Sequence, residues 1–87
     1  MKIEYHRQFL KHFKKRIAPH SQLVSKFEER LRLKMTDPKN PVLHDHQLLG
    51  SKSEYRSFSV TGDTRVVYRV EGDVLRLYDI GTHAQVY

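Results

Sequence analysis

The sequence contains no cysteine, so neither a disulfide nor a thiolate metal site can stabilise it, and its stability must come from packing. No apolar run approaches the roughly 18 residues that a bilayer-spanning helix needs. The first residues, MKIEY, lack the apolar segment of a secretory signal. We therefore expect one small cytoplasmic domain, residues 1–87, with one modest core and no membrane association.

Acidic residues are scarce only in the first half of the chain. Residues 1–44 hold 11 Lys and Arg against four Asp and Glu, whereas residues 45–87 hold five against six. A basic surface attracts polyanions and speeds their encounter with the protein. The pattern is typical of a protein that binds nucleic acid or an acidic protein, and it is also typical of a helix surface that is simply solvated.

Two helices are predicted in this basic half. Residues 6–17 carry an apolar stripe at helical spacing, and Pro19 ends that helix. A second amphipathic helix is expected over residues 21–36, with Ser21 as its N-cap. Most lysines and arginines lie outside both apolar stripes, so we expect a helical hairpin with one apolar side and one basic side.

Strand patterns surround the helices in the sequence. Residues 2–5 predict a short strand, and the segments EYRSFSV, TRVVYRV and VLRLYDI predict three more, separated by the turns TGD and EGD. These three form an antiparallel meander. The order of elements favours an α+β fold in which the N-terminal strand and the helical hairpin pack on an antiparallel sheet.

The middle strand of the meander predicts which side chains face away from the helices. Val66 and Tyr68 share the face that we expect to meet the helices, whereas Arg65 and Arg69 share the other. Arg56 on the neighbouring strand joins the two arginines if the register allows. Such a cluster either surrounds an anion or pairs with nearby carboxylates.

Two histidines stand in the segment LHDHQLLG. His44 and His46 point the same way if the chain is extended, and His-x-His can bind a metal. No fixed third ligand accompanies them, so we expect neither a metal nor a cofactor. Leu43, Leu48 and Leu49 are expected to anchor this loop to the core.

The titratable residues of the second half suit metal-free cleavage of RNA. That reaction needs a base for the 2′-hydroxyl proton, an acid for the 5′-oxygen and a cation for the charge that develops on the phosphate. Histidine serves either proton role near neutral pH, and arginine matches phosphate oxygens. The candidates are a histidine of the LHDHQLLG loop, an arginine on the sheet face, an aspartate in a Gly-Asp turn, and the C-terminal His83 and Tyr87.

Residues 45–87 resemble the RelE/ParE superfamily of type II toxins, and most closely its YafQ-like branch. The resemblance rests on a D-H-x-L-x-G loop, a following Y-R, and a G-T-H motif with an aromatic residue four positions after the histidine. Residues 1–44 match only in kind. The resemblance implies a RelE-like, microbial ribonuclease-like fold. It also implies a bacterial or archaeal mRNA interferase, a metal-independent endoribonuclease that inhibits translation by cutting mRNA on the ribosome.

The same resemblance implies roles for individual residues. His46 and His83 match the two histidines, Asp63 the turn aspartate and Tyr87 the terminal aromatic residue, while Arg65 matches the phosphate ligand of many RelE-like toxins. A flexible Gly81 is expected to let the chain bend before the histidine.

Two kinds of partner follow from the resemblance, the ribosome with its mRNA and a cognate acidic antitoxin. Basic residues of the helices and the following strand are the expected contacts with RNA and the ribosome: Lys11, Lys14, Lys15, Arg30, Lys34 and Arg56.

Two positions depart from the YafQ-like pattern, because Ser59 replaces a histidine and Thr64 replaces an aromatic residue. Two other functions stay open on the same fold, the second of them because of these departures. One is a ParE-like poison of DNA gyrase, which needs no histidine pair, and the other is a catalytically weak module that binds its antitoxin.

Overall fold

The computed structural model describes all 87 residues. Its elements are β1 (Lys2–Tyr5), α1 (Arg7–Arg16), α2 (Ser21–Thr36), the 3₁₀ turn η1 (Pro41–Leu43), β2 (His46–Gln47), the 3₁₀ turn η2 (Gly50–Lys52), β3 (Arg56–Ser59), β4 (Thr64–Glu71), β5 (Val74–Thr82) and α3 (His83–Val86). The predicted α+β class is confirmed. The predicted helices are confirmed to within one residue at each end.

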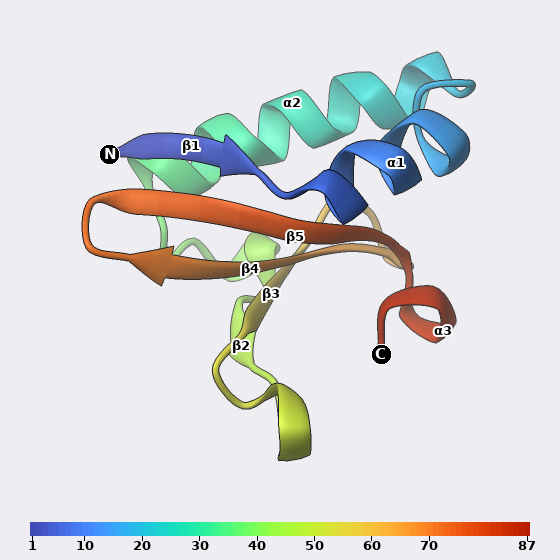
Figure 1. Ribbon diagram of the computed structural model, residues 1–87. Helices are drawn as coiled ribbons and strands as arrows, with labels where there is room; N and C mark the ends of the chain where they lie inside the picture. Colours follow the sequence, from blue (N-terminus) through green and yellow to red (C-terminus); the bar gives the residue numbers. More distant parts are fainter.

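All five strands form one mixed sheet in the order β1-β5-β4-β3-β2 (Figure 1). The meander β3-β4-β5 is antiparallel, as predicted. β1 lies beside β5 and runs parallel to it, so the expectation of a purely antiparallel sheet is wrong at this edge. The first and last strands meet here, and a parallel pair always needs a long connection, which no local pattern reveals.

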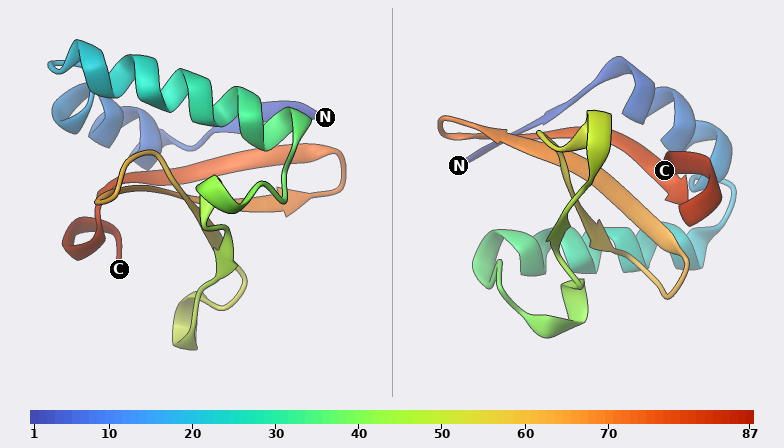
Figure 2. Two further views of the ribbon diagram at one scale, coloured as in Figure 1. Left: turned by 180° about the vertical axis from the view of Figure 1, so that it is seen from behind. Right: turned by 90° about the horizontal axis from the view of Figure 1, so that it is seen from below.

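Both long helices cover one face of the sheet (Figures 1 and 2). Val66 and Tyr68 face the helices, as predicted, in a cluster of 11 buried side chains. The cluster comprises Phe9, Ile17, Phe27, Leu43, Phe58, Val60, Val66, Tyr68, Leu75, Leu77 and Ile80. No helix is both long and apolar enough to cross a membrane.

The start of α2 differs from the prediction by one residue. His20 precedes the helix, and its carbonyl accepts the backbone N–H groups of Leu23 and Val24 at 3.0 and 3.1 Å. Ser21 is therefore the first helical residue and not the N-cap. No side chain caps this end, so capping residues alone do not determine where α2 begins.

On the other face of the sheet, the η2 loop and α3 project away from the long helices (Figure 2). A smaller apolar cluster of Leu48, Val67 and Val86 joins them to the sheet, with Tyr55 and Tyr78 packed against it. Residues from the middle and the end of the chain thereby meet on this face.

Candidate active site

The C-terminal segment is held by a capping box at the start of α3. The Thr82 hydroxyl accepts the backbone N–H of Gln85, and the Gln85 side chain accepts the backbone N–H of Thr82 at 2.8 Å. The helical turn that follows brings His83 and Tyr87 together, because residues four apart lie on the same side. Their ring centroids are 4.4 Å apart.

Gly81 is not the flexible hinge that the sequence suggested. It lies within β5, and its backbone is outside the left-handed region. A Cβ atom at this position would lie 2.6 Å from Gln85 Oε1 and 2.7 Å from Arg16 Nη1. The glycine therefore leaves room for the ends of two side chains that hold the strand end.

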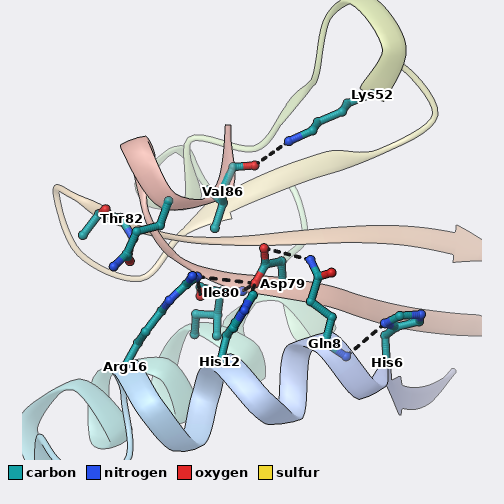
Figure 3. Close-up of polar contacts among 10 residues, drawn as sticks. His6, Gln8, His12, Arg16, Lys52, Asp79, Ile80, Thr82 and Val86 are labelled. Carbon is teal, nitrogen blue, oxygen red and sulfur yellow. Dashed lines mark hydrogen bonds and ion pairs between the residues drawn. The ribbon is translucent and has the colours of Figure 1, made fainter.

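A stripe of α1 holds the end of β5 just before this glycine (Figure 3). The Asp79 carboxylate accepts a hydrogen bond from Gln8 Nε2 at 3.0 Å and lies 2.5 Å from His12 Nδ1. Arg16 Nη1 donates to the carbonyl of Ile80 at 3.0 Å and lies 3.6 Å from Asp79. The three helical residues are four apart, so one helix face fixes the strand that leads into α3.

A cleft of about 650 Å³ joins the C-terminal segment to the D-H-x-L-x-G loop. The ring centroids of His46 and Tyr87 lie 6.3 Å apart across it, and His83 stands on the same wall as Tyr87. The lining residues are His46, Gln47, Leu48, Leu49, Gly50, Ser51, Lys52, His83 and Tyr87. Three of the five predicted site residues therefore meet in one place.

The backbone holds the His46 ring in a defined orientation. Its Nδ1 lies 2.9 Å from the carbonyl of His44, a residue with the left-handed φ of 46°. The structure contains no group of three His, Cys, Asp or Glu side chains that would hold a metal. Leu43 and Leu48 are buried and anchor the loop as predicted, but Leu49 is 90% exposed and does not.

Asp45, the residue before His46, ties the loop to three elements. Its nearly buried carboxylate accepts hydrogen bonds from Lys34 Nζ at 2.8 Å, Arg56 Nε at 2.7 Å and the Tyr68 hydroxyl. Burial alone would raise the pKa of Asp45, but these three donors lower it below its usual value. Burial and the contact with Asp45 raise the pKa of Tyr68 well above its usual range.

The six cations predicted to bind RNA divide into two groups. The lysines of α1 are exposed and form neither ion pairs nor side-chain hydrogen bonds: Lys11, Lys14 and Lys15. The other three act within the chain, since Lys34 and Arg56 bind Asp45 and Arg30 donates to the carbonyl of Val42 at 3.1 Å. The first group is therefore better placed to meet a partner.

Arg56 does not join Arg65 on one face of the sheet, contrary to that expectation. Arg56 is paired across the strands with Tyr68, whose side chain faces the helices. Arg65 lies on the opposite face and donates to Ser59 Oγ and, at 3.4 Å, to the carbonyl of Gly62. No carboxylate neutralises it.

The other charged residues near this face have separate surroundings. Arg69 pairs with Glu54 at 3.1 Å and with Glu71 at 2.6 Å, so the alternative of carboxylate pairing holds for this arginine. Asp63 lies in the exposed turn before β4, where its backbone N–H donates to Thr61 Oγ1 at 3.3 Å. Its carboxylate forms no hydrogen bond or ion pair, and the structure does not bring it to either histidine.

Two serines of β3 connect Tyr87 with Arg65. Ser57 is buried, and its hydroxyl is hydrogen-bonded to the Tyr87 hydroxyl. Ser59, which bonds Arg65, lies two residues further along the same face, or about 7 Å along the strand. The sequence predicted neither Ser57 nor the cleft residue Lys52, and only their place within the motif segment hinted at them.

Solved structures with the same architecture define the class of protein. E. coli YafQ from strain BL21(DE3) is 29% identical with a TM-score of 0.82, and the match covers 99% of this chain and 97% of that one. YafQ in the E. coli DinJ-YafQ complex is 32% identical with a TM-score of 0.83 and the same coverage. A YoeB/ParE toxin from Agrobacterium tumefaciens, 22% identical with a TM-score of 0.81 over 95% and 99% of the two chains, shares the fold. The chain thus has the fold of RelE-like toxins.

Its family follows from the sequence as a whole. The profile described as "Bacterial toxin of type II toxin-antitoxin system, YafQ" matches residues 1–87. The chain belongs to the YafQ family of type II toxins. No curated protein matches it.

Proposed function

We propose that this toxin is an endoribonuclease that cuts mRNA on the ribosome by acid–base chemistry without a metal ion. The observation that carries the proposal is the meeting of His46, His83 and Tyr87 in one cleft, although His46 is 37 and 41 positions from the other two in the sequence. Two histidines supply both proton transfers that cleavage of a ribonucleotide requires.

The chemistry begins when a base removes the proton from a 2′-hydroxyl. The 2′-oxygen then attacks phosphorus, the bond to the 5′-oxygen breaks, and an acid protonates that oxygen, which leaves a 2′,3′-cyclic phosphate and a 5′-hydroxyl. The carbonyl of His44 can only accept, so Nδ1 of His46 carries the ring proton. Nε2 is then free to take a proton, which favours His46 as the base and His83 as the acid.

The remaining predicted site residues receive unequal roles. Tyr87, held by Ser57, positions the substrate on the wall of the cleft. Arg65 of β4 donates a hydrogen bond to Ser59 on the same face of the sheet and adds positive charge beside the RNA backbone. Asp63 receives no proton-transfer role, because its carboxylate contacts neither histidine.

The ribosome and an antitoxin are the proposed partners, and the bacterial cytoplasm is the proposed location. Lys11, Lys14 and Lys15 are free to contact ribosomal phosphates, and such contacts weaken as salt rises. DinJ bound to YafQ is the antitoxin precedent among the solved structures, and the same basic surface suits an acidic antitoxin.

A reconstituted translation reaction tests the proposal. Primer extension on one mRNA should reveal cuts in register with codons only when both ribosomes and the intact protein are present. His46→Ala and His83→Ala should each slow cleavage at least about 100-fold. His20→Ala is the matched control, because this exposed histidine lies outside the cleft and its side chain caps no backbone group.

Absence of cuts by the intact protein would refute the proposal. A DNA supercoiling assay with gyrase then decides between the remaining functions. Gyrase inhibition that survives both histidine substitutions would indicate a ParE-like poison, and no inhibition would leave a module that only binds its antitoxin.

A further inference from the structure

The cleft contains one permanent cation, and it is not the arginine predicted from the sequence. Lys52 is the only lysine or arginine among the lining residues. Arg65 is absent from the lining, and its guanidinium is engaged by Ser59 and Gly62. Cleavage of a phosphodiester places additional negative charge on the phosphate oxygens, and a fixed cation is the usual means of stabilising it.

Lys52 is held close to α3, the side of the cleft that carries His83 and Tyr87. It ends the η2 turn, and its Nζ donates to the carbonyl of Val86 at 2.9 Å (Figure 3). Val86 lies in α3 between His83 and Tyr87, so the lysine bridges the two walls that carry the proposed catalytic side chains.

The ammonium group of Lys52 retains binding capacity. An ammonium has three N–H donors, and the Val86 carbonyl occupies one of them. No carboxylate lies within ion-pair distance of Lys52, in contrast to Lys34 and Arg56, which share Asp45. Two donors and an uncompensated charge are therefore available to an anion in the cleft.

We propose that Lys52 is a catalytic residue that binds the scissile phosphate of single-stranded RNA and stabilises the charge formed during cleavage. The inference rests on the proposed function, and it assigns to Lys52 the phosphate role that the sequence suggested for Arg65. Arg65 remains on the adjacent surface, beside the neighbouring part of the RNA backbone.

The contact with Val86 requires variants that separate charge from structure. Lys52→Gln removes the charge but keeps an N–H donor for the Val86 carbonyl, whereas Lys52→Arg keeps both. Lys2→Gln is the matched control, because Lys2 is an exposed lysine of β1 whose side chain forms no hydrogen bond or ion pair.

Single-turnover cleavage on the ribosome is the first measurement. Lys52→Gln should lower the rate at saturating toxin about 100-fold, with ribosome affinity within twofold of the unsubstituted protein. Lys52→Arg should stay within about tenfold, and Lys2→Gln should not change the rate. A Lys52→Gln protein that cleaves at the unsubstituted rate overturns the inference while the proposed function stands.

A binding measurement separates this inference from the proposed function. The probe is a trinucleotide with 2′-deoxyribose at its central position, which cannot be cleaved, titrated into the isolated protein by NMR. We expect Lys52→Gln to weaken binding at least fivefold, even if the unsubstituted protein cleaves no mRNA and the proposed function fails. Affinity that is equal in the two proteins, or absent from both, overturns the inference.

Discussion

Substitution of Gly81 by alanine tests how the strand end is held in place. The new methyl group would stand 2.6 Å from Gln85 Oε1, 2.7 Å from Arg16 Nη1 and 3.1 Å from Gln85 Cβ. Both side chains must move. The hydrogen bonds from the Thr82 N–H to Gln85, at 2.8 Å, and from Arg16 to the Ile80 carbonyl, at 3.0 Å, are then lost.

The size of the effect follows from these two bonds. Each contributes about 1 kcal/mol to the free energy of unfolding. Replacement of glycine by alanine returns about 0.5 kcal/mol, because the unfolded chain loses freedom. The net destabilisation is then about 1.5 kcal/mol, which lowers the Tm of a domain of this size by about 6–12 °C.

Thermal and urea unfolding followed by circular dichroism measure this difference. Gly62→Ala is the matched control, since no atom lies within 4 Å of the added carbon and its φ is not in the left-handed region. It should change stability by less than about 0.5 kcal/mol. Equal stability of the Gly81→Ala and Gly62→Ala proteins would refute the steric explanation, as would an undiminished penalty in an Arg16→Ala, Gln85→Ala background.

Three further predictions concern the cleft and the loop that leads into it. Tyr87→Phe should lower the free energy of unfolding by about 1 kcal/mol, because it leaves the buried Ser57 hydroxyl without its partner, and urea denaturation measures it. Asp45→Asn should lower the free energy of unfolding by about 2 kcal/mol at pH 7. The folded pKa of Asp45 is below its unfolded value of about 3.9, so the ionised carboxylate stabilises the fold fully above about pH 5. The stability difference between the unsubstituted protein and Asp45→Asn should therefore shrink as the pH falls below about 4, which a pH series of unfolding curves measures. Leu48→Ala should cost about 2–3 kcal/mol and Leu49→Ala less than about 0.5 kcal/mol, since the first side chain is buried and the second is 90% exposed.

Periodicity predicted the parts of the fold that depend on neighbours in sequence. The bounds of α1 and α2 and the helix-facing side of β4, with Val66 and Tyr68, follow from local spacing alone. The parallel pairing of β1 with β5 does not, because it joins the two ends of the chain. Nor does the position of Arg56, which depends on the register between β3 and β4.

The candidate site was predictable to the extent that motifs mark single residues. The motifs identified His46, His83 and Tyr87, and the structure brings them into one cleft. They do not show which charged groups already have partners inside the protein. The Asp63 carboxylate contacts neither histidine. Lys52 is recognised only from the contact between the η2 turn and α3, which no motif marks.

The chemistry of the new RNA ends tests the central claim most directly. The mRNA fragments formed on ribosomes by the intact toxin can be treated with polynucleotide kinase and periodate to identify their 3′ termini. If one histidine takes the 2′-hydroxyl proton and the other protonates the 5′-oxygen, the new fragments end in 2′,3′-cyclic phosphate or 3′-phosphate. These termini should be absent with His83→Ala. Fragments that end in 3′-hydroxyl groups, or that form equally with His83→Ala, would contradict the assignment of the cleft as the active site.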